Sequence, residues 1–92
     1  MKITTLVWDE NNVDHIARHQ VEPEEVEEVC YSNPLILRAG KKKQKLYYIL
    51  GQSQNGRYLF IVARYIGKGQ ARVITARDMN NSERTRFGRR CK

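Results

Sequence analysis

The chain has 92 residues, with 17 Lys and Arg against 10 Asp and Glu, and a formal net charge of +7. Such a length predicts a single domain over residues 1–92. Apolar residues make up 40% of the chain and fall in runs, which excludes a disordered basic tail. No apolar run approaches the roughly 18 residues of a membrane span, and the first residues lack the apolar stretch of a signal peptide. We therefore expect a cytoplasmic protein without a membrane segment.

The first third of the chain predicts one strand followed by two helices. Residues 3–8 are β-branched and apolar, as in a short strand. Asp9 can cap a helix over residues 10–19, and Pro23 suits the first position of a second helix. The inward stripe of this second helix is apolar and consists of Val26, Val29 and Cys30.

From residue 35 onward the apolar period changes to two, which predicts strands. These strands cover residues 35–38, 46–52, 58–65 and 72–76. An Asn-Gly pair between the second and third of them is the strongest short-range hairpin signal. Residues 80–82 offer caps for a last, basic helix. The order is β-α-α-β-β-β-β-α, an α+β fold in which an antiparallel meander packs with helices.

The turns also predict which residues face each other. A two-residue loop at the Asn-Gly pair places Tyr47 opposite Arg64, and a three-residue loop at residues 67–69 places Arg64 opposite Arg72. The same registers pair Leu50 with Ile61, Val62 with Ile74 and Ile66 with Gln70. Because side chains alternate across a sheet, one end of one face is predicted to carry Lys45, Tyr47, Arg64 and Arg72. By the same rule Arg77 falls on the opposite face from Arg64.

Charge is divided unevenly along the chain, which bears on its partners. Residues 1–33 hold two basic and eight acidic residues, whereas residues 34–92 hold fifteen basic and two acidic ones. Opposed arginines repel each other, and a bound polyanion would remove that penalty; the alternative is a solvated edge where the two splay apart. The acidic helix face is either solvated or a docking surface for a basic partner.

RNA can be cleaved without a metal when the 2′-hydroxyl attacks the adjacent phosphorus. Guanidinium groups stabilise the charge that develops, and a nearby base takes the proton. The basic half lacks a dense carboxylate cluster, which disfavours a two-metal nuclease. His15 and His19 have a metal-ligand spacing without a third ligand, and Cys30 and Cys91 lack a CxxC spacing. We therefore expect no metal and no other cofactor. His19 is the best single candidate for proton transfer, and the alternative is a helix-end histidine bonded to backbone.

Several segments, taken in order, resemble the BrnT toxin family. They are residues 8–10 (WDE), 15–19 (HIARH), 21–29 (VEPEEVEEV), 56–60 (GRYLF), 73–79 (VITARDM) and 83–84 (ER). The resemblance implies a RelE-like fold and a type II toxin whose ribonuclease activity stops translation. It also implies a cognate antitoxin, usually a ribbon–helix–helix protein, with promoter DNA bound only by the toxin–antitoxin complex.

Carried over by position, the functional residues of these motifs fall on Arg18, His19, Arg77 and Arg84. The chain departs from the family at Gln20, where glycine is usual, and at Phe87, where tyrosine is common. An arginine often precedes the first long strand, where this chain has Lys45.

Together these observations predict a metal-independent endoribonuclease neutralised by an antitoxin that covers the basic sheet. The predicted catalytic residues are Arg64, Arg77 and His19, and the predicted RNA-binding residues are Lys45, Tyr47, Arg72 and Arg84. Arg77 has a structural alternative, since it could pair with Asp78, Glu83 or a helix carboxylate. The alternative functions are a RelE- or ParE-like toxin that binds a protein such as gyrase without catalysis, and a basic RNA-binding module.

Overall fold

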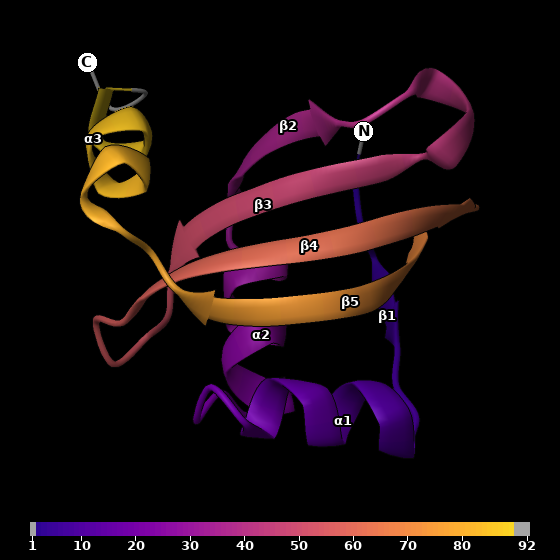
Figure 1. Cartoon of the computed structure of the whole chain (residues 1–92), viewed down its shortest axis with the longest axis horizontal. Coiled ribbons are helices and arrows are strands. Elements are labelled where there is room, and N and C mark those ends of the chain that lie inside the picture. The colour runs from indigo at the N-terminus through magenta and orange to yellow at the C-terminus, as the bar shows by residue number, and fades with distance from the viewer. Residues whose placement is uncertain (1, 90–92) are drawn as a thin grey trace.

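The computed structural model of the chain describes residues 2–89 and has the predicted order of elements (Figure 1). In chain order these are β1 (Thr5–Val7), α1 (Glu10–Ala17), α2 (Pro23–Tyr31), β2 (Leu35–Ala39), the 3-10 turn η1 (Lys42–Gln44), β3 (Leu46–Gln52), β4 (Tyr58–Gly67), β5 (Gln70–Asp78) and α3 (Asn81–Arg89). The α+β class is confirmed. No helix in the described part of the chain is long and apolar enough to cross a membrane.

The five strands form one mixed sheet in the order β1-β5-β4-β3-β2. The meander from β2 to β5 is antiparallel, as predicted, whereas β1 pairs with β5 in parallel. Helices α1 and α2 cover one face of the sheet, and α3 stands at one end on the other side (Figure 1). We call these faces the helical face and the open face.

Local sequence signals explain where α1 begins and ends. The Asp9 carboxylate accepts a hydrogen bond from the Asn12 amide at 3.1 Å, and the Asn12 side chain accepts one from the Asp9 amide at 2.8 Å. This reciprocal cap satisfies two donors that the first turn would leave unpaired. The helix ends at Ala17 rather than at residue 19, and Gln20 takes the left-handed conformation at φ 59°. The position where the family usually has glycine is thus occupied by a strained non-glycine residue.

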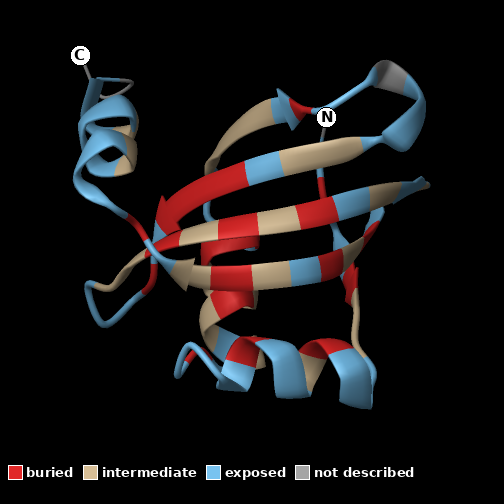
Figure 2. Cartoon of the chain, viewed as in Figure 1, coloured by how far each residue is buried: buried red, intermediate tan, exposed pale blue. Residues whose placement is uncertain are grey.

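The core lies between the helical face and the two helices, and buried residues alternate with less buried ones along the first part of β4 (Figure 2). Its fully buried members include Ile16, Val21, Val26 and Val29 from the helical segments and Ile49, Leu59, Ile61 and Val73 from the strands. Helix α2 approaches β3 so closely that a Cβ on Gly51 would lie 2.7 Å from the Val29 side chain. The predicted stripe of the second helix is confirmed.

The β3–β4 hairpin differs from the prediction by one residue. The Ser53 amide donates to the Arg57 carbonyl at 2.8 Å, which leaves a three-residue loop over residues 54–56. Only Gly56 in this loop has a positive φ, at 90°, whereas the predicted two-residue turn needs it at both central positions. Tyr47 therefore pairs with Ala63, and the predicted pairing of Tyr47 with Arg64 is wrong. Leu50 likewise pairs with Phe60 and not with Ile61.

The β4–β5 turn is also different, yet one predicted pairing holds. Lys68 and Gly69 form a two-residue turn, with φ of 55° and 79°, and Gly67 pairs with Gln70. The predicted three-residue loop, with Ile66 opposite Gln70, is wrong. A register shift between Tyr65 and Gly67 then restores the pairing of Arg64 with Arg72, which is confirmed.

Candidate functional site

A second irregularity of the β4–β5 pairing, this one in β5, determines which side chains share the open face. Val62 pairs with Thr75 whereas Ala63 pairs with Val73, so Ile74 has no partner in β4 and forms a β-bulge. The predicted pairing of Val62 with Ile74 is therefore wrong. An extra residue reverses the facing of everything beyond it.

The bulge brings Arg77 onto the open face together with Arg64 and Arg72. Arg77 pairs with Phe60, which lies an even number of residues from Arg64 in β4, so both point to the same side. The prediction that Arg77 lies on the opposite face from Arg64 is wrong, because it assumed a regular ladder. Phe60 and Arg64 are four positions apart, about 13 Å at roughly 3.3 Å per residue. The arginines therefore border the two ends of one surface.

Asn12 of α1 supports this bulge from the helical face. Its side chain is 4% exposed and donates to the carbonyls of Val7 at 2.8 Å and Val73 at 3.2 Å. Val73 directly precedes the bulged Ile74, where the pairing of β4 with β5 is irregular. The side-chain amide of Asn12 therefore satisfies the Val73 carbonyl at this point. Asn12 was not a predicted site residue. The signal available in the sequence was the spacing of Asp9 and Asn12, three residues apart at the start of the predicted helix.

Arg64 and Arg72 lie opposite each other but bind separate partners. The Arg64 guanidinium donates to the Gln44 carbonyl at 2.9 Å, and Arg72 forms an ion pair with Asp9 at 2.6 Å. The bond from the Asn12 amide, and then Arg72, lower the pKa of Asp9. The repulsion expected between opposed arginines is thus relieved because the two side chains splay apart. Both guanidiniums still lie at the surface.

Arg77 is held by a carboxylate of α3. Its guanidinium forms a bidentate pair with Glu83, at 2.8 and 2.9 Å, and also donates to the Asp78 carbonyl. This contact lowers the pKa of Glu83 and raises that of Arg77. Glu83 also accepts a hydrogen bond from the Asn80 amide, so the same carboxylate caps α3. The structural alternative for Arg77, pairing with Glu83, is confirmed.

Aromatic rings lie between the cations of the open face. The Arg77 guanidinium lies 4.3 Å above the Phe60 ring, whose centroid is 5.1 Å from that of Tyr48. Arg84 of α3 lies 4.3 Å above the ring of Tyr58. A groove of about 590 Å³ runs between α3 and the sheet, lined chiefly by Leu37, Tyr48, Leu50, Phe60, Val62 and Arg86. Stacked rings beside guanidinium groups can hold bases and phosphates.

Two predicted members of the basic cluster lie elsewhere. Tyr47 shares a face with Ala63 and Val73, both buried, so it points to the helical face. Lys45 lies outside the ladder, in a left-handed conformation between η1 and β3, and its carbonyl accepts from the Tyr65 amide. The four-residue cluster is therefore wrong, because the one-residue change in the hairpin loop moved β3 relative to β4.

His19 is not brought together with the arginines. It lies in the turn after α1, where its ring is 6.0 Å from that of His15 and its carbonyl accepts from Arg57. His15 instead lines a shallow pocket of about 240 Å³ with Arg72. Among residues 2–89, no group of three or more His, Cys, Asp or Glu side chains could hold a metal ion. Cys91 lies outside the described residues, and Cys30 is a buried free thiol whose pKa burial raises to about 12.

Arg57 is a structural residue that the sequence interpretation missed. Its guanidinium binds the Asp78 carboxylate at 2.6 Å, the Glu25 carboxylate at 3.2 Å and the carbonyls of His19 and Gln20. These contacts join the β3–β4 hairpin to the α1–α2 turn and to the end of β5. The only signal for this role in the sequence was that Arg57 directly follows Gly56 in one of the segments that resemble the toxin family of the sequence analysis.

Comparison with protein families finds one family model that matches most of the chain. A family described as "Ribonuclease toxin, BrnT, of type II toxin-antitoxin system" matches residues 8–83. The chain belongs to the BrnT family. The match begins at the residue before the Asp9 cap and ends at the Glu83 that binds Arg77, so it includes strands β2 to β5 and stops within α3. A BrnT toxin acts with a cognate antitoxin, and the family is one of ribonucleases. No curated relative matches the chain.

Proposed function

We propose that this BrnT toxin is a metal-independent endoribonuclease of the cytoplasm that cleaves RNA on the open face of its sheet and thereby inhibits translation. The observation that carries the proposal is the bulge at Ile74, since it gathers Arg64, Arg72 and Arg77 on one face. That face combines the three guanidiniums with the rings of Tyr48, Tyr58 and Phe60.

Charge stabilisation is the part of the chemistry that the arginines would supply. The RNA 2′-oxygen forms a bond to phosphorus while the bond to the 5′-oxygen breaks, and negative charge grows on the other phosphoryl oxygens. Arg64 and Arg77 would bind those oxygens, with Arg72 and Arg84 on neighbouring phosphates, and bases would stack on the rings. Removing one donor of this kind costs roughly 100- to 1000-fold in rate. Lys45 would contact RNA only at the margin of this surface, and Tyr47, which points to the helical face, would not contact it.

Proton transfer would fall to a histidine at the α1 edge of the sheet. The base takes the 2′-hydroxyl proton, and an acid returns one to the 5′-oxygen. His19 is the residue favoured by sequence, whereas His15 shares a pocket with Arg72. The single variants His15→Ala and His19→Ala assign the role, because one of them should lose about 100-fold or more in cleavage. Cleavage unchanged in both variants would remove histidine from the mechanism.

The proposed partners follow from the same surface. An antitoxin that covers the open face would block RNA, and a ribbon–helix–helix domain in it would give the complex its promoter binding. The toxin by itself contacts RNA and no membrane.

The experiment is expression of the toxin without its antitoxin, followed by mapping of cellular RNA ends. We expect translation to stop with new internal RNA ends, and purified toxin to cleave RNA equally in EDTA. Loss of cleavage in EDTA would contradict metal independence. Growth arrest with intact RNA and damaged DNA would instead indicate a toxin that binds gyrase, and RNA binding without cleavage would indicate a binding module.

A further inference from the structure

The two edges of the sheet differ in how they are protected. Edge strands present unpaired backbone groups, and proteins usually shorten, cover or charge them. Strand β1 is only three residues long, and Tyr31 of α2 lies beside its Leu6 backbone. Strand β2 has five residues, and within residues 2–89 no group hydrogen-bonds with it from its outer side. Its edge is therefore open.

Strand β2 is also apolar where an edge is usually polar. Leu35, Ile36 and Leu37 follow one another along it, each half-buried, and no strand in the described part of the chain lies on its outer side. Only Arg38 in this strand is exposed. Ile36 packs partly against the core and Leu37 lines the groove beneath α3, but both side chains stay half-buried.

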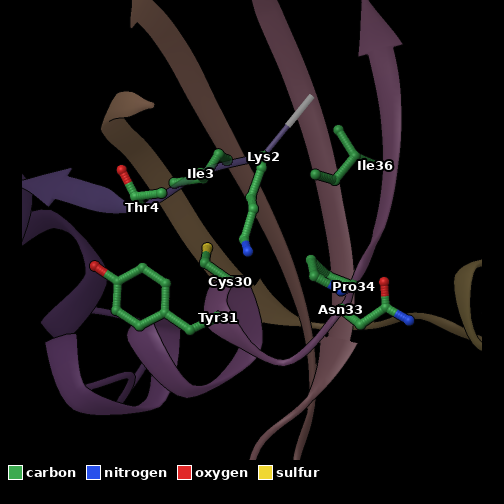
Figure 3. Close-up of a pocket in the computed structure, with 8 residues that line it drawn as sticks. All are labelled: Lys2, Ile3, Thr4, Cys30, Tyr31, Asn33, Pro34 and Ile36. Atoms are coloured by element: carbon green, nitrogen blue, oxygen red, sulfur yellow. The ribbon is translucent and has the colours of Figure 1, made fainter. Parts of the chain in front are cut away.

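A hollow lies beside β2 on each face of the sheet. On the helical face, a pocket of about 640 Å³ is lined by Ile36 together with Ile3, Cys30 and Pro34 (Figure 3). On the open face, Leu37 lines the groove beneath α3. Ile36 and Leu37 are consecutive, so their side chains point to opposite faces. A strand added beside β2 would in the same way direct alternate side chains to the two hollows.

The charge around this edge is of one sign. The chain has no Asp or Glu between Glu28 and Asp78, a stretch that includes β2 and the segments on both sides of it. Lys2 lines the helical-face pocket and Arg86 the open-face groove, and Arg38 is exposed on the helical side of β2. Such surroundings favour an acidic segment over a second copy of this basic chain.

We propose that the free edge of β2 binds an extended, acidic segment of the cognate antitoxin as a sixth strand. Its backbone would pair with Leu35–Ala39, its alternate apolar side chains would fill the two hollows, and its carboxylates would face Lys2, Arg38 and Arg86. The inference rests on membership in the toxin family and not on the ribonuclease mechanism.

Amide hydrogen exchange of the wild-type toxin, alone and in complex with its antitoxin, tests the location. We expect the amides of Leu35–Ala39 to become at least tenfold more slowly exchanging in the complex, while those of β1 change little. Unchanged exchange in β2, with protection confined to α3 and the open face, would overturn the proposal.

A charge pair at one position tests the chemistry of the partner. Both Leu37→Glu and Leu37→Lys lose the apolar contact, but only Leu37→Glu repels an acidic segment, so we expect it to bind antitoxin at least tenfold more weakly than Leu37→Lys. Ile66→Glu, which adds a carboxylate at an exposed site near the β4–β5 turn, is the control and should bind like wild type. Equal affinity of the two Leu37 variants would overturn the acidic partner.

The mass of the free toxin in solution tests whether a second copy of this chain, rather than the antitoxin, occupies the edge of β2. A monomer is expected. A dimer that Leu37→Glu dissociates would show that a second copy occupies the edge, which would overturn the proposal. None of these three measurements involves RNA, so failure here leaves the ribonuclease proposal untouched, and loss of cleavage in the earlier experiment leaves this one untouched.

Discussion

The two faces of the sheet are built for different purposes. On the helical face Ile49, Leu59 and Ile61 are completely buried against α1 and α2, and the side chains there are almost all apolar. On the open face the same strands carry half-buried rings and guanidinium groups, and the one helix present, α3, buries none of its described residues. Hydrophobic burial accounts for the first face. It does not account for arginines gathered on the second, which makes that face the place to look for function.

The largest expected effect on stability separates the two faces within one strand. Leu59→Ala opens a cavity in the core and should lower the free energy of unfolding by about 2–5 kcal/mol. Val62→Ala, three residues along on the open face, should cost about 1 kcal/mol or less, because its surroundings are only partly buried. Chemical denaturation of both variants measures the difference. Equal losses would mean that the open face is as much a core as the helical face.

The next largest expected effect on stability concerns Asn12, which lies on the helical face and supports the bulge that directs Arg77 to the open face. Asn12→Ala removes the donor to the Val73 carbonyl and leaves buried polar groups unpaired, at a cost of about 1–3 kcal/mol. Because the bulge sets the facing of Arg77, RNA cleavage should fall as well, even at temperatures where the variant is fully folded. Leu59→Ala is the matched control, since it is destabilised without touching the bulge. Full cleavage by folded Asn12→Ala would show that Asn12 does not hold Arg77 in place.

The smallest expected effect concerns the contact between α3 and the sheet. The pKa of Glu83 is lowered below its ordinary value of 4.5, so the carboxylate stabilises the fold above that pH and the contribution is lost as pH falls through the folded value. Glu83→Gln should cost up to about 1 kcal/mol at neutral pH, since the Arg77 partner is part-exposed. The difference from wild type should shrink as the pH falls below 4.5 and vanish once Glu83 is protonated in the folded state, and thermal unfolding across pH measures it. A difference that is constant with pH would exclude the ion pair as its cause.

The order of elements was predictable from the sequence because each signal is local. The Asp9 cap, Pro23 and the change of apolar period at residue 35 all act within a few residues. Loop length and bulges are set by the whole sheet, so they could not be predicted in this way. The pairing of Arg64 with Arg72 was right although its turn was wrong, since a shorter loop and a bulge compensate.

The site was predicted less well for the same physical reason. A single inserted residue at Ile74 reverses the face of Arg77, and one extra loop residue moves Tyr47 to the helical face. The interaction that supports the bulge comes from Asn12, sixty-one residues away from Val73 in the chain. No local pattern in β5 contains that information.

The most direct test of the open face compares two arginines of the same sheet that point to opposite sides. Arg64 lies on the open face and Arg38, at the β2 edge, on the helical side, and both are exposed. The measurement is the rate of RNA cleavage by Arg64→Ala and Arg38→Ala, with the melting temperature of each. We expect Arg64→Ala to lose about 100-fold or more with its melting temperature nearly unchanged, while Arg38→Ala cleaves like wild type. Equal rates in the two variants, or unfolding of Arg64→Ala, would contradict the assignment of the open face as the ribonuclease surface.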